Sequence, residues 1–264
     1  MRTALLVALG AALACTAAAQ EGPTGPRATL VITVAGGVHT GHSLYEIPKQ
    51  PVLIAPATHD TLRLVRSIGS GLMLGFSGTY FPSALVGLTG EISFIDLPLA
   101  NSCDSLYQAS GDPRNIEVCG NIDNSTVSSS VFGFMGGVTL RTAPRGQVSP
   151  YLRGSLGITV TSGSTVAMEG AFVQGGQVFV QPIILDDDPQ GIAFAGGLAA
   201  GITAPVGTGY QLRLEIRDDY FPLERASGPA DALGNAPKES NYYHHFSLLI
   251  GFDVVLEQKR GRRY

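Results

Sequence analysis

The residues best suited to chemistry lie near the end of the chain, where the sequence reads His244-His245-Phe246-Ser247. A histidine can deprotonate a serine hydroxyl and turn it into a nucleophile, provided that a carboxylate orients the histidine. His245 and Ser247 are two residues apart, so on a β-strand their side chains share one face. The spacing permits a hydrolase site with His245 as base and Ser247 as nucleophile, but the sequence offers no evident carboxylate partner.

The His245-x-Ser247 pair resembles a motif of outer-membrane lipid A deacylases, which would imply a lipid-modifying hydrolase. The residues that follow, Leu248 and Leu249, replace the polar and small residues of that family. Both members of the pair are also expected to face inward, away from lipid. We therefore expect that the chain is not an enzyme, and that His244 and His245 are interface histidines at a strand end.

A second set of polar residues consists of charged side chains on one face of otherwise apolar strands. The set contains both signs, as it must if buried charges are to be paired. A packed polar interior is the function that we favour for it, and the lining of a narrow, gated ion path is the alternative. Its members are Glu91, Arg141, Arg153, Arg213, Glu215, Arg217 and Asp253.

Two cysteines, Cys103 and Cys119, lie beyond the N-terminal region. An even pair in an exported protein predicts a disulfide. In the chain-entropy model, closing a loop of this size contributes about 3 kcal/mol. The acidic run Asp186-Asp187-Asp188 lacks the spacing of a calcium loop, which supplies about six or more oxygen ligands. We expect no metal site and no cofactor.

The N-terminus has the features of an export signal. Arg2 supplies a positive charge, residues 4–14 are apolar, and Ala17-Ala18-Ala19 is a small-x-small cleavage site. These features predict a signal peptide over residues 1–19 and a short periplasmic segment over residues 20–27. Lipidation of Cys15 is a weaker alternative, because the expected upstream leucine is displaced by one position.

The composition narrows the class of protein. Charged residues make up 14% of the chain, against roughly 25% in soluble domains, and the mean hydropathy is +0.20. After the first twenty residues no run of about 18 apolar residues could form a spanning helix. The net charge of −4 gives no reason to expect nucleic-acid binding. A soluble protein with a large core and a membrane barrel both fit these values.

Alternation of apolar and polar residues predicts strands, and the choice of a membrane barrel rests on the glycine-rich polar face, the rhythm of short and long connections and the aromatic strand ends. From Tyr210 to Asp219, one face carries Leu212, Leu214 and Ile216, and the other carries arginine and glutamate. Eight segments show such alternation, each about long enough to cross a bilayer at a tilt. They begin near Leu30, Leu72, Val86, Phe132, Leu152, Ile192, Tyr210 and Phe246.

Short and long connections alternate along the chain, beginning with a long one. Short turns are predicted at 81–84, 143–148 and 205–209, and long connections at 41–60, 96–124, 162–190 and 223–241. Backbone groups in lipid must all be paired, so a spanning sheet must close on itself. Val52–Ile54 and Val178–Val180 could be extra strands in the loops, and a ten-stranded barrel is the alternative count.

In pattern and layout, the segment from Ala28 to Glu257 resembles the small outer-membrane barrels of the OmpA/OmpX type. The resemblance implies an all-β, eight-stranded antiparallel up-and-down transmembrane β-barrel, with both termini in the periplasm and four long external loops. Such barrels usually end their last strand with an aromatic residue. Here a basic tail, residues 258–264, follows the last strand, which departs from this pattern.

The function expected from this layout is a structural role or a surface interaction through the loops, where binding usually resides on a rigid scaffold. A narrow channel, the hydrolase, and a soluble periplasmic carrier with its apolar face inward are the alternatives. The expected partners are outer-membrane lipid and an extracellular ligand, and the protein is expected to be a monomer. Strand-end aromatic residues are expected to form girdles at the two interfaces. They are Tyr80, Phe81, Tyr151, Tyr220, Phe221, Tyr242 and Tyr243.

Overall fold

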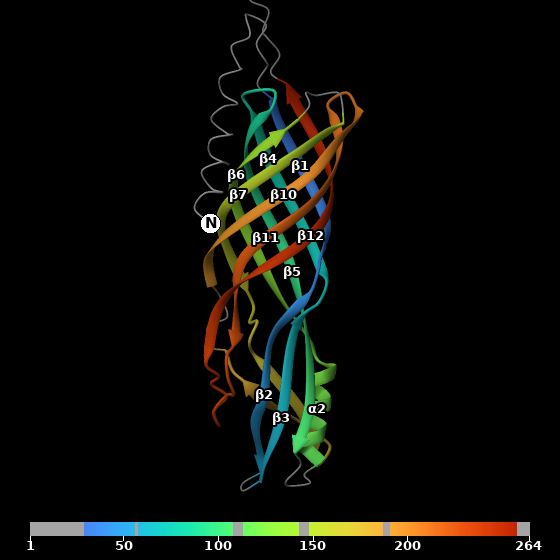
Figure 1. Cartoon of the computed structure of the whole chain (residues 1–264). Helices are drawn as coiled ribbons and strands as arrows, with labels where there is room; N and C mark the ends of the chain where they lie inside the picture. The colour runs from blue at the N-terminus through green and yellow to red at the C-terminus, as the bar shows by residue number, and fades with distance from the viewer. Residues whose placement is uncertain (1–28, 56–57, 108–112, 143–147, 187–190, 258–264) are drawn as a thin grey trace, which may run out of the picture.

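The computed structural model describes residues 29–55, 58–107, 113–142, 148–186 and 191–257 (Figure 1). The predicted signal peptide, the segment 20–27, Cys15 and the basic tail lie outside these residues. The described part contains twelve β-strands and one α-helix. No helix in it is long and apolar enough to span a membrane.

Eight of the strands close into an antiparallel ring. Their order around the ring is β1-β4-β5-β6-β7-β10-β11-β12, and β12 pairs again with β1. The predicted eight-stranded up-and-down barrel is therefore confirmed. The strands are β1 (Thr29–His39), β4 (Gly71–Phe81), β5 (Val86–Tyr107), β6 (Thr126–Arg141), β7 (Ser149–Ser162), β10 (Gly191–Gly207), β11 (Tyr210–Ala226) and β12 (Lys238–Glu257).

The apolar face of every ring strand points away from the barrel axis. On β11, Leu212, Leu214 and Ile216 are exposed, whereas the arginines and glutamate between them are buried. On β7 and β10, Leu156 is 76% exposed and Phe194 is 78% exposed. An apolar surface that encircles a closed barrel requires lipid around it. The barrel thus belongs in the outer membrane, and the soluble-carrier alternative, which places the apolar face inward, is wrong.

At one end of the barrel the long connections fold together into a compact unit, which we call the cap (lower part of Figure 1). It contains β2 (His42–Ala55), β3 (Thr58–Ile68), the hairpin of β8 (Met168–Gln174) and β9 (Gln177–Ile184), and α2 (Pro113–Asn124). It also contains the parts of β5, β11 and β12 that extend beyond the closed ring of strands. The predicted loop 41–60 is wrong, because strands occupy most of residues 42–68.

The cap explains why ten strands could be counted. β3 pairs with β5 from Ile68↔Leu99 to Thr61↔Tyr107, beyond the point where β5 leaves the ring, and β2 pairs with β3. One sheet therefore has ten strands, although eight of them close the barrel. The predicted strand at Val52–Ile54 is part of the longer β2, and the predicted strand at Val178–Val180 is part of β9, which pairs with β8.

The cap is built around a hydrophobic core. Leu62 and Leu64 of β3, Ile47 of β2, and Val118 and Ile122 of α2 are fully buried in one cluster. Burial of side chains of this size contributes about 1.5–3 kcal/mol each. These apolar contacts hold the long connections to one another, so they do not project as four separate loops.

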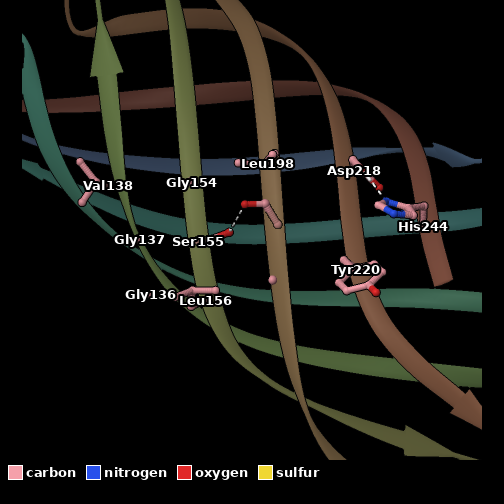
Figure 2. A pocket seen from close by; sticks show the side chains of 12 residues that line it. Gly136, Gly137, Val138, Gly154, Ser155, Leu156, Leu198, Asp218, Tyr220 and His244 are labelled. Atoms are coloured by element: carbon pink, nitrogen blue, oxygen red, sulfur yellow. Dashed lines mark hydrogen bonds and ion pairs between the residues drawn. The ribbon is translucent and has the colours of Figure 1, made fainter. Parts of the chain in front are cut away.

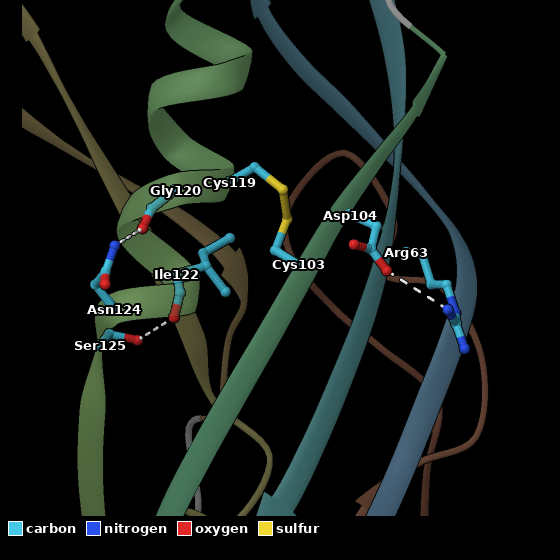
Figure 3. Close-up of a disulfide and its surroundings, with 8 residues drawn as sticks. All are labelled: Arg63, Cys103, Asp104, Cys119, Gly120, Ile122, Asn124 and Ser125. Carbon is cyan, nitrogen blue, oxygen red and sulfur yellow. Dashed lines mark hydrogen bonds and ion pairs between the residues drawn. A yellow bond between two sulfur atoms is a disulfide. The ribbon is translucent and has the colours of Figure 1, made fainter.

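The predicted disulfide joins Cys103 of β5 to Cys119 of α2 and is confirmed, with the two Cα atoms 5.4 Å apart (Figure 3). The last turn of α2 is capped by side chains. Asn124 Nδ2 donates to the Gly120 carbonyl at 2.6 Å, and Ser125 Oγ donates to the Ile122 carbonyl at 2.8 Å. The disulfide thereby fixes a capped helix against the outer part of β5.

The predicted aromatic girdles are only partly present. Tyr80, Tyr220 and Tyr242 are exposed on the outside of the sheet, as a girdle requires. In contrast Phe81, Tyr151 and Phe221 are buried on the inner side. Phe81 and Tyr151 lie near strand ends as predicted, whereas Phe221 lies within β11, and the alternation of the strands turns all three inward.

Candidate functional site

The interior of the barrel holds a continuous series of charged side chains. They alternate in sign and form ion pairs with one another, and we call this series the ladder. Arg217 pairs with Asp219 and Glu91, and Arg153 pairs with Glu91 at 2.8 Å and with Glu215 at 2.5 Å. Further along, Arg213 pairs with Glu215 at 3.6 Å and with Asp253 at 3.0 Å. Every charge in the ladder thus faces an opposite charge, as buried ions require.

Hydroxyl groups complete the ladder at the end nearer the short turns. Thr33 Oγ1 donates to Asp253 at 2.8 Å, and the Tyr151 hydroxyl donates to Glu215. The ring of Tyr151 also lies 4.8 Å from the Arg213 guanidinium. The cavities beside these residues measure about 10 and 20 Å³, room for about one water molecule each.

The structure brings together six of the seven charged residues singled out in the sequence. The seventh, Arg141, lies at the end of β6, where it donates to the Ala84 carbonyl and stacks on Phe81. It is therefore placed to support the β4–β5 turn. Sequence reasoning missed Asp219, although it continues the alternating series of Arg213, Glu215 and Arg217 by one more position.

An apolar layer separates the ladder from the cap. Met73, Ile95, Val131 and Leu249 point into the barrel at its outer end and are nearly fully buried. They belong to the same hydrophobic cluster as the core of the cap. Leu249 also lies directly across from Glu215, so these apolar side chains leave little room beside the ladder.

Three histidines lie beside that layer, where the barrel meets the cap. The ring of His245 is 4.9 Å from the ring of His42 and 6.4 Å from that of His39, and it stacks on Phe221 at 4.1 Å. Burial, with a smaller effect of His39, lowers the pKa of His42 from its usual range. No group of three or more candidate metal ligands is present among the described residues.

The geometry gives little support to the His245–Ser247 hydrolase. Both residues are buried inside the barrel, and within the described chain neither ring nitrogen of His245 nor Ser247 Oγ has a hydrogen-bond partner. Asp219 is the residue directly across from His245 on β11, but its carboxylate pairs with Arg217. Ser247, His245 and Asp219 thus lie close together without forming the hydrogen bonds of a catalytic triad. They also lie inside the barrel, where lipid cannot reach them.

The outer wall of the barrel carries a different feature, a groove of about 680 Å³, which we call the wall groove (Figure 2). It crosses β6, β7 and β10 and ends at β11 and β12. Three outward-facing glycines, Gly136, Gly154 and Gly196, lie along it, and Leu156 and Leu198 line it between them. This volume lies within the range of small-molecule sites, which is about 300–1,000 Å³.

One end of the wall groove is polar. His244 Nδ1 donates to Asp218 Oδ2 at 2.8 Å, and the ring of His244 lies 4.7 Å from that of Tyr220 (Figure 2). Asp218 follows the last apolar outward residue of β11, Ile216, so the pair lies where the apolar surface ends. Asp218 could not be singled out from the sequence, because its contact with His244 depends on the register of β11 and β12.

Comparison with known proteins adds resemblances of fold only. No protein-family model matches the chain, and no curated protein sequence does. Among solved structures, outer membrane protein OprG from Pseudomonas aeruginosa is 12% identical, with 88% of this chain and 97% of that chain covered and a TM-score of 0.45. Neisserial surface protein A is 11% identical, with 87% and 99% covered and a TM-score of 0.41.

The outer membrane protease OmpT from Escherichia coli is 8% identical, with 87% of this chain and 97% of that chain covered and a TM-score of 0.36. A surface protein and a protease are thus both among the similar structures, so the comparison assigns no role. The fold itself rests on the closed ring of strand pairings, and the place in the membrane rests on the apolar outer face.

Proposed function

We propose that this protein is a non-enzymatic outer-membrane barrel whose closed interior anchors a folded cap, and that the cap makes contacts at the cell surface. The observation that carries the proposal is that the cap is one unit. Gln50 exchanges hydrogen bonds of 2.8 and 3.2 Å with the backbone of Ala230, which ties the first long connection to the fourth. The Tyr45 hydroxyl donates to the Val166 carbonyl at 2.9 Å and ties the first to the third.

The second connection is held in the same way. Arg66 is fully buried and donates to Asn101 Oδ1 at 2.9 Å and to the Thr165 carbonyl at 3.1 Å. Gly170 of β8 packs so closely on Val118 of α2 that a Cβ atom would lie 2.7 Å from it. A preformed surface of this kind binds a partner without first ordering flexible loops, which would cost affinity. As part of this proposal, the cap binds an extracellular ligand and the protein is a monomer.

The narrow channel is the less favoured function, because the ladder and the apolar layer fill the barrel. We expect the purified protein to give no conductance steps in planar lipid bilayers at neutral pH. Conductance that changes in Arg213→Ala or Glu91→Ala would instead identify the ladder as an ion path. Arg63→Ala, at an exposed ion pair of the cap, is the matched control.

The orientation that the proposal requires can be tested with single cysteines, since Cys103 and Cys119 are joined to each other. Val180 on β9 is 60% exposed in the cap, and Leu85 at the β4–β5 turn is 47% exposed. We expect a membrane-impermeant maleimide to label Val180→Cys on intact cells. Leu85→Cys should react only after the outer membrane has been permeabilised.

Labelling of Leu85→Cys alone on intact cells would mean that the barrel is inserted the other way round. Equal protection of both variants would mean that the cap is not at the cell surface, and either result would refute the proposal. A boiled and an unboiled sample of each variant on a gel verifies that the barrel has folded.

A further inference from the structure

The wall groove exists because side chains are missing, although the backbone does not require their absence. A Cβ atom at Gly136 would meet nothing within 4 Å, and at Gly154 and Gly196 the nearest atoms would be at 3.8 and 3.5 Å. These are open space or ordinary van der Waals distances. The three glycines therefore shape the outer surface, and larger residues there would fill the groove without a clash.

The groove runs from the middle of the apolar wall towards its edge. Gly136 and Leu156 are register neighbours in the centre of the outward-facing parts of β6 and β7. The same cross-strand row continues through Gly196 and Tyr220 and ends at His244. Its apolar part thus faces the hydrocarbon of the membrane, and its polar part lies at the level of the lipid headgroups.

The polar end presents a partly exposed carboxylate, that of Asp218. Asp218 Oδ2 accepts from His244, and the Asp218 side chain as a whole is 25% exposed. With Nδ1 donating to a carboxylate, a neutral His244 presents Nε2 as an acceptor as well. A partly exposed carboxylate at the end of an apolar groove favours a cationic donor, because hydrogen bonds between ionised partners are the stronger ones. An ammonium group, with three donors and a positive charge, would satisfy this end of the groove.

We propose that the wall groove binds one phospholipid with a primary ammonium headgroup, such as phosphatidylethanolamine. One acyl chain lies over Gly136, Gly154 and Gly196, and the ammonium group donates to Asp218. A second copy of the protein fits the observations less well, because an apolar barrel wall would bury the Asp218–His244 pair without supplying a cation. This inference does not depend on what the cap binds.

The test uses the full protein in vesicles of equal parts phosphatidylethanolamine and phosphatidylcholine with identical acyl chains. The protein is extracted into mild detergent, and retained lipid is counted by native mass spectrometry. We expect one retained lipid, with phosphatidylethanolamine favoured about tenfold, since a charge-assisted hydrogen bond of the usual strength corresponds to that ratio. The methylated headgroup of phosphatidylcholine cannot donate to Asp218.

Two variants separate the two ends of the site. Asp218→Asn should still retain a lipid but lose the tenfold preference. The double variant Gly136→Leu with Gly196→Leu should retain none. Its matched control is Gly36→Leu with Gly78→Leu, which adds the same side chains on β1 and β4, away from the groove, where the nearest atom to either Cβ is at 3.4 Å. The control should behave like the unmodified protein.

Three results would overturn the proposal. Equal lipid retention by the groove-filled variant and its control would show that lipid binds elsewhere or nonspecifically. A preference for phosphatidylcholine, or none in the unmodified protein, would refute the role of Asp218. A lipid-free dimer that disappears in the groove-filled variant would show that the groove holds a second copy of the chain. Failure of the cap to bind a partner would leave all of these outcomes unchanged.

Discussion

Replacing Arg217 by methionine is expected to lower the free energy of unfolding of the barrel by about 3–5 kcal/mol, the usual cost of breaking a buried ion pair from one side. Arg217 is 3% exposed and pairs with both Asp219 and Glu91. Its loss leaves Asp219 without the ion pair at 2.8 Å, whereas Glu91 keeps Arg153. The cost therefore comes mainly from the stranded charge of Asp219.

The measurement is urea-induced unfolding in detergent micelles, followed by loss of the migration shift of the unboiled protein. Arg63→Met is the control, because Arg63 forms exposed ion pairs with Glu46 and Asp104. Exposed pairs contribute little, so this variant should unfold like the unmodified protein. Adding Asp219→Asn to Arg217→Met should recover part of the loss, because it removes the stranded charge. Equal midpoints for Arg217→Met and Arg63→Met would mean that the ladder does not stabilise the barrel.

Replacing Leu64 by alanine is expected to destabilise the cap by about 2–5 kcal/mol and to leave the barrel folded. Leu64 is fully buried on β3, where its neighbours across the sheet are Ile47 and Cys103. The cavity that alanine leaves lies in the core shared by the sheet and α2. Lipid surrounds the barrel strands, so their pairing does not depend on this contact.

Limited proteolysis of the protein in micelles, with and without boiling before electrophoresis, measures the two parts separately. Leu64→Ala should be cut faster within the cap while the resistant barrel keeps its migration shift. Leu106→Ala, which removes the same group from a side chain that is 52% exposed on β5, should be cut like the unmodified protein. Simultaneous loss of cap and barrel would show that they unfold as a single unit.

The barrel could be predicted from the sequence because period-two alternation is a local signal. Each ring strand shows an apolar face in its own ten or so residues, and the face that points to lipid follows from the charges on the other one. The cap could not be predicted in the same way. β2 shows no regular alternation, because its register with β3 shifts at three places, and β3 buries two charged residues, Asp60 and Arg66, on its inner face. The segment from Gly41 to Asp60 therefore resembled a loop.

The helix α2 was missed for a related reason. Its buried residues Asn115, Val118, Cys119 and Ile122 form a narrow stripe, and only two of these four side chains are aliphatic. The start signal was present in Pro113, at a position that suits the first turn of a helix. For the candidate sites the missing information was register. Asp219 shares its face with residues already singled out, but the pairing of Asp218 with His244 depends on how β11 and β12 align.

Three strands continue from the barrel into the cap without a break: β5 with 22 residues, β12 with 20 and β11 with 17. The part of β5 from Leu97 to Tyr107 alone extends about 35 Å along the strand at the usual rise. A pull on a partner bound at the tip would therefore act along the length of strands that are hydrogen-bonded to their neighbours. If the cap binds a partner as proposed, these continuous strands would fix the distance of that contact from the membrane and pass a mechanical load directly into the barrel.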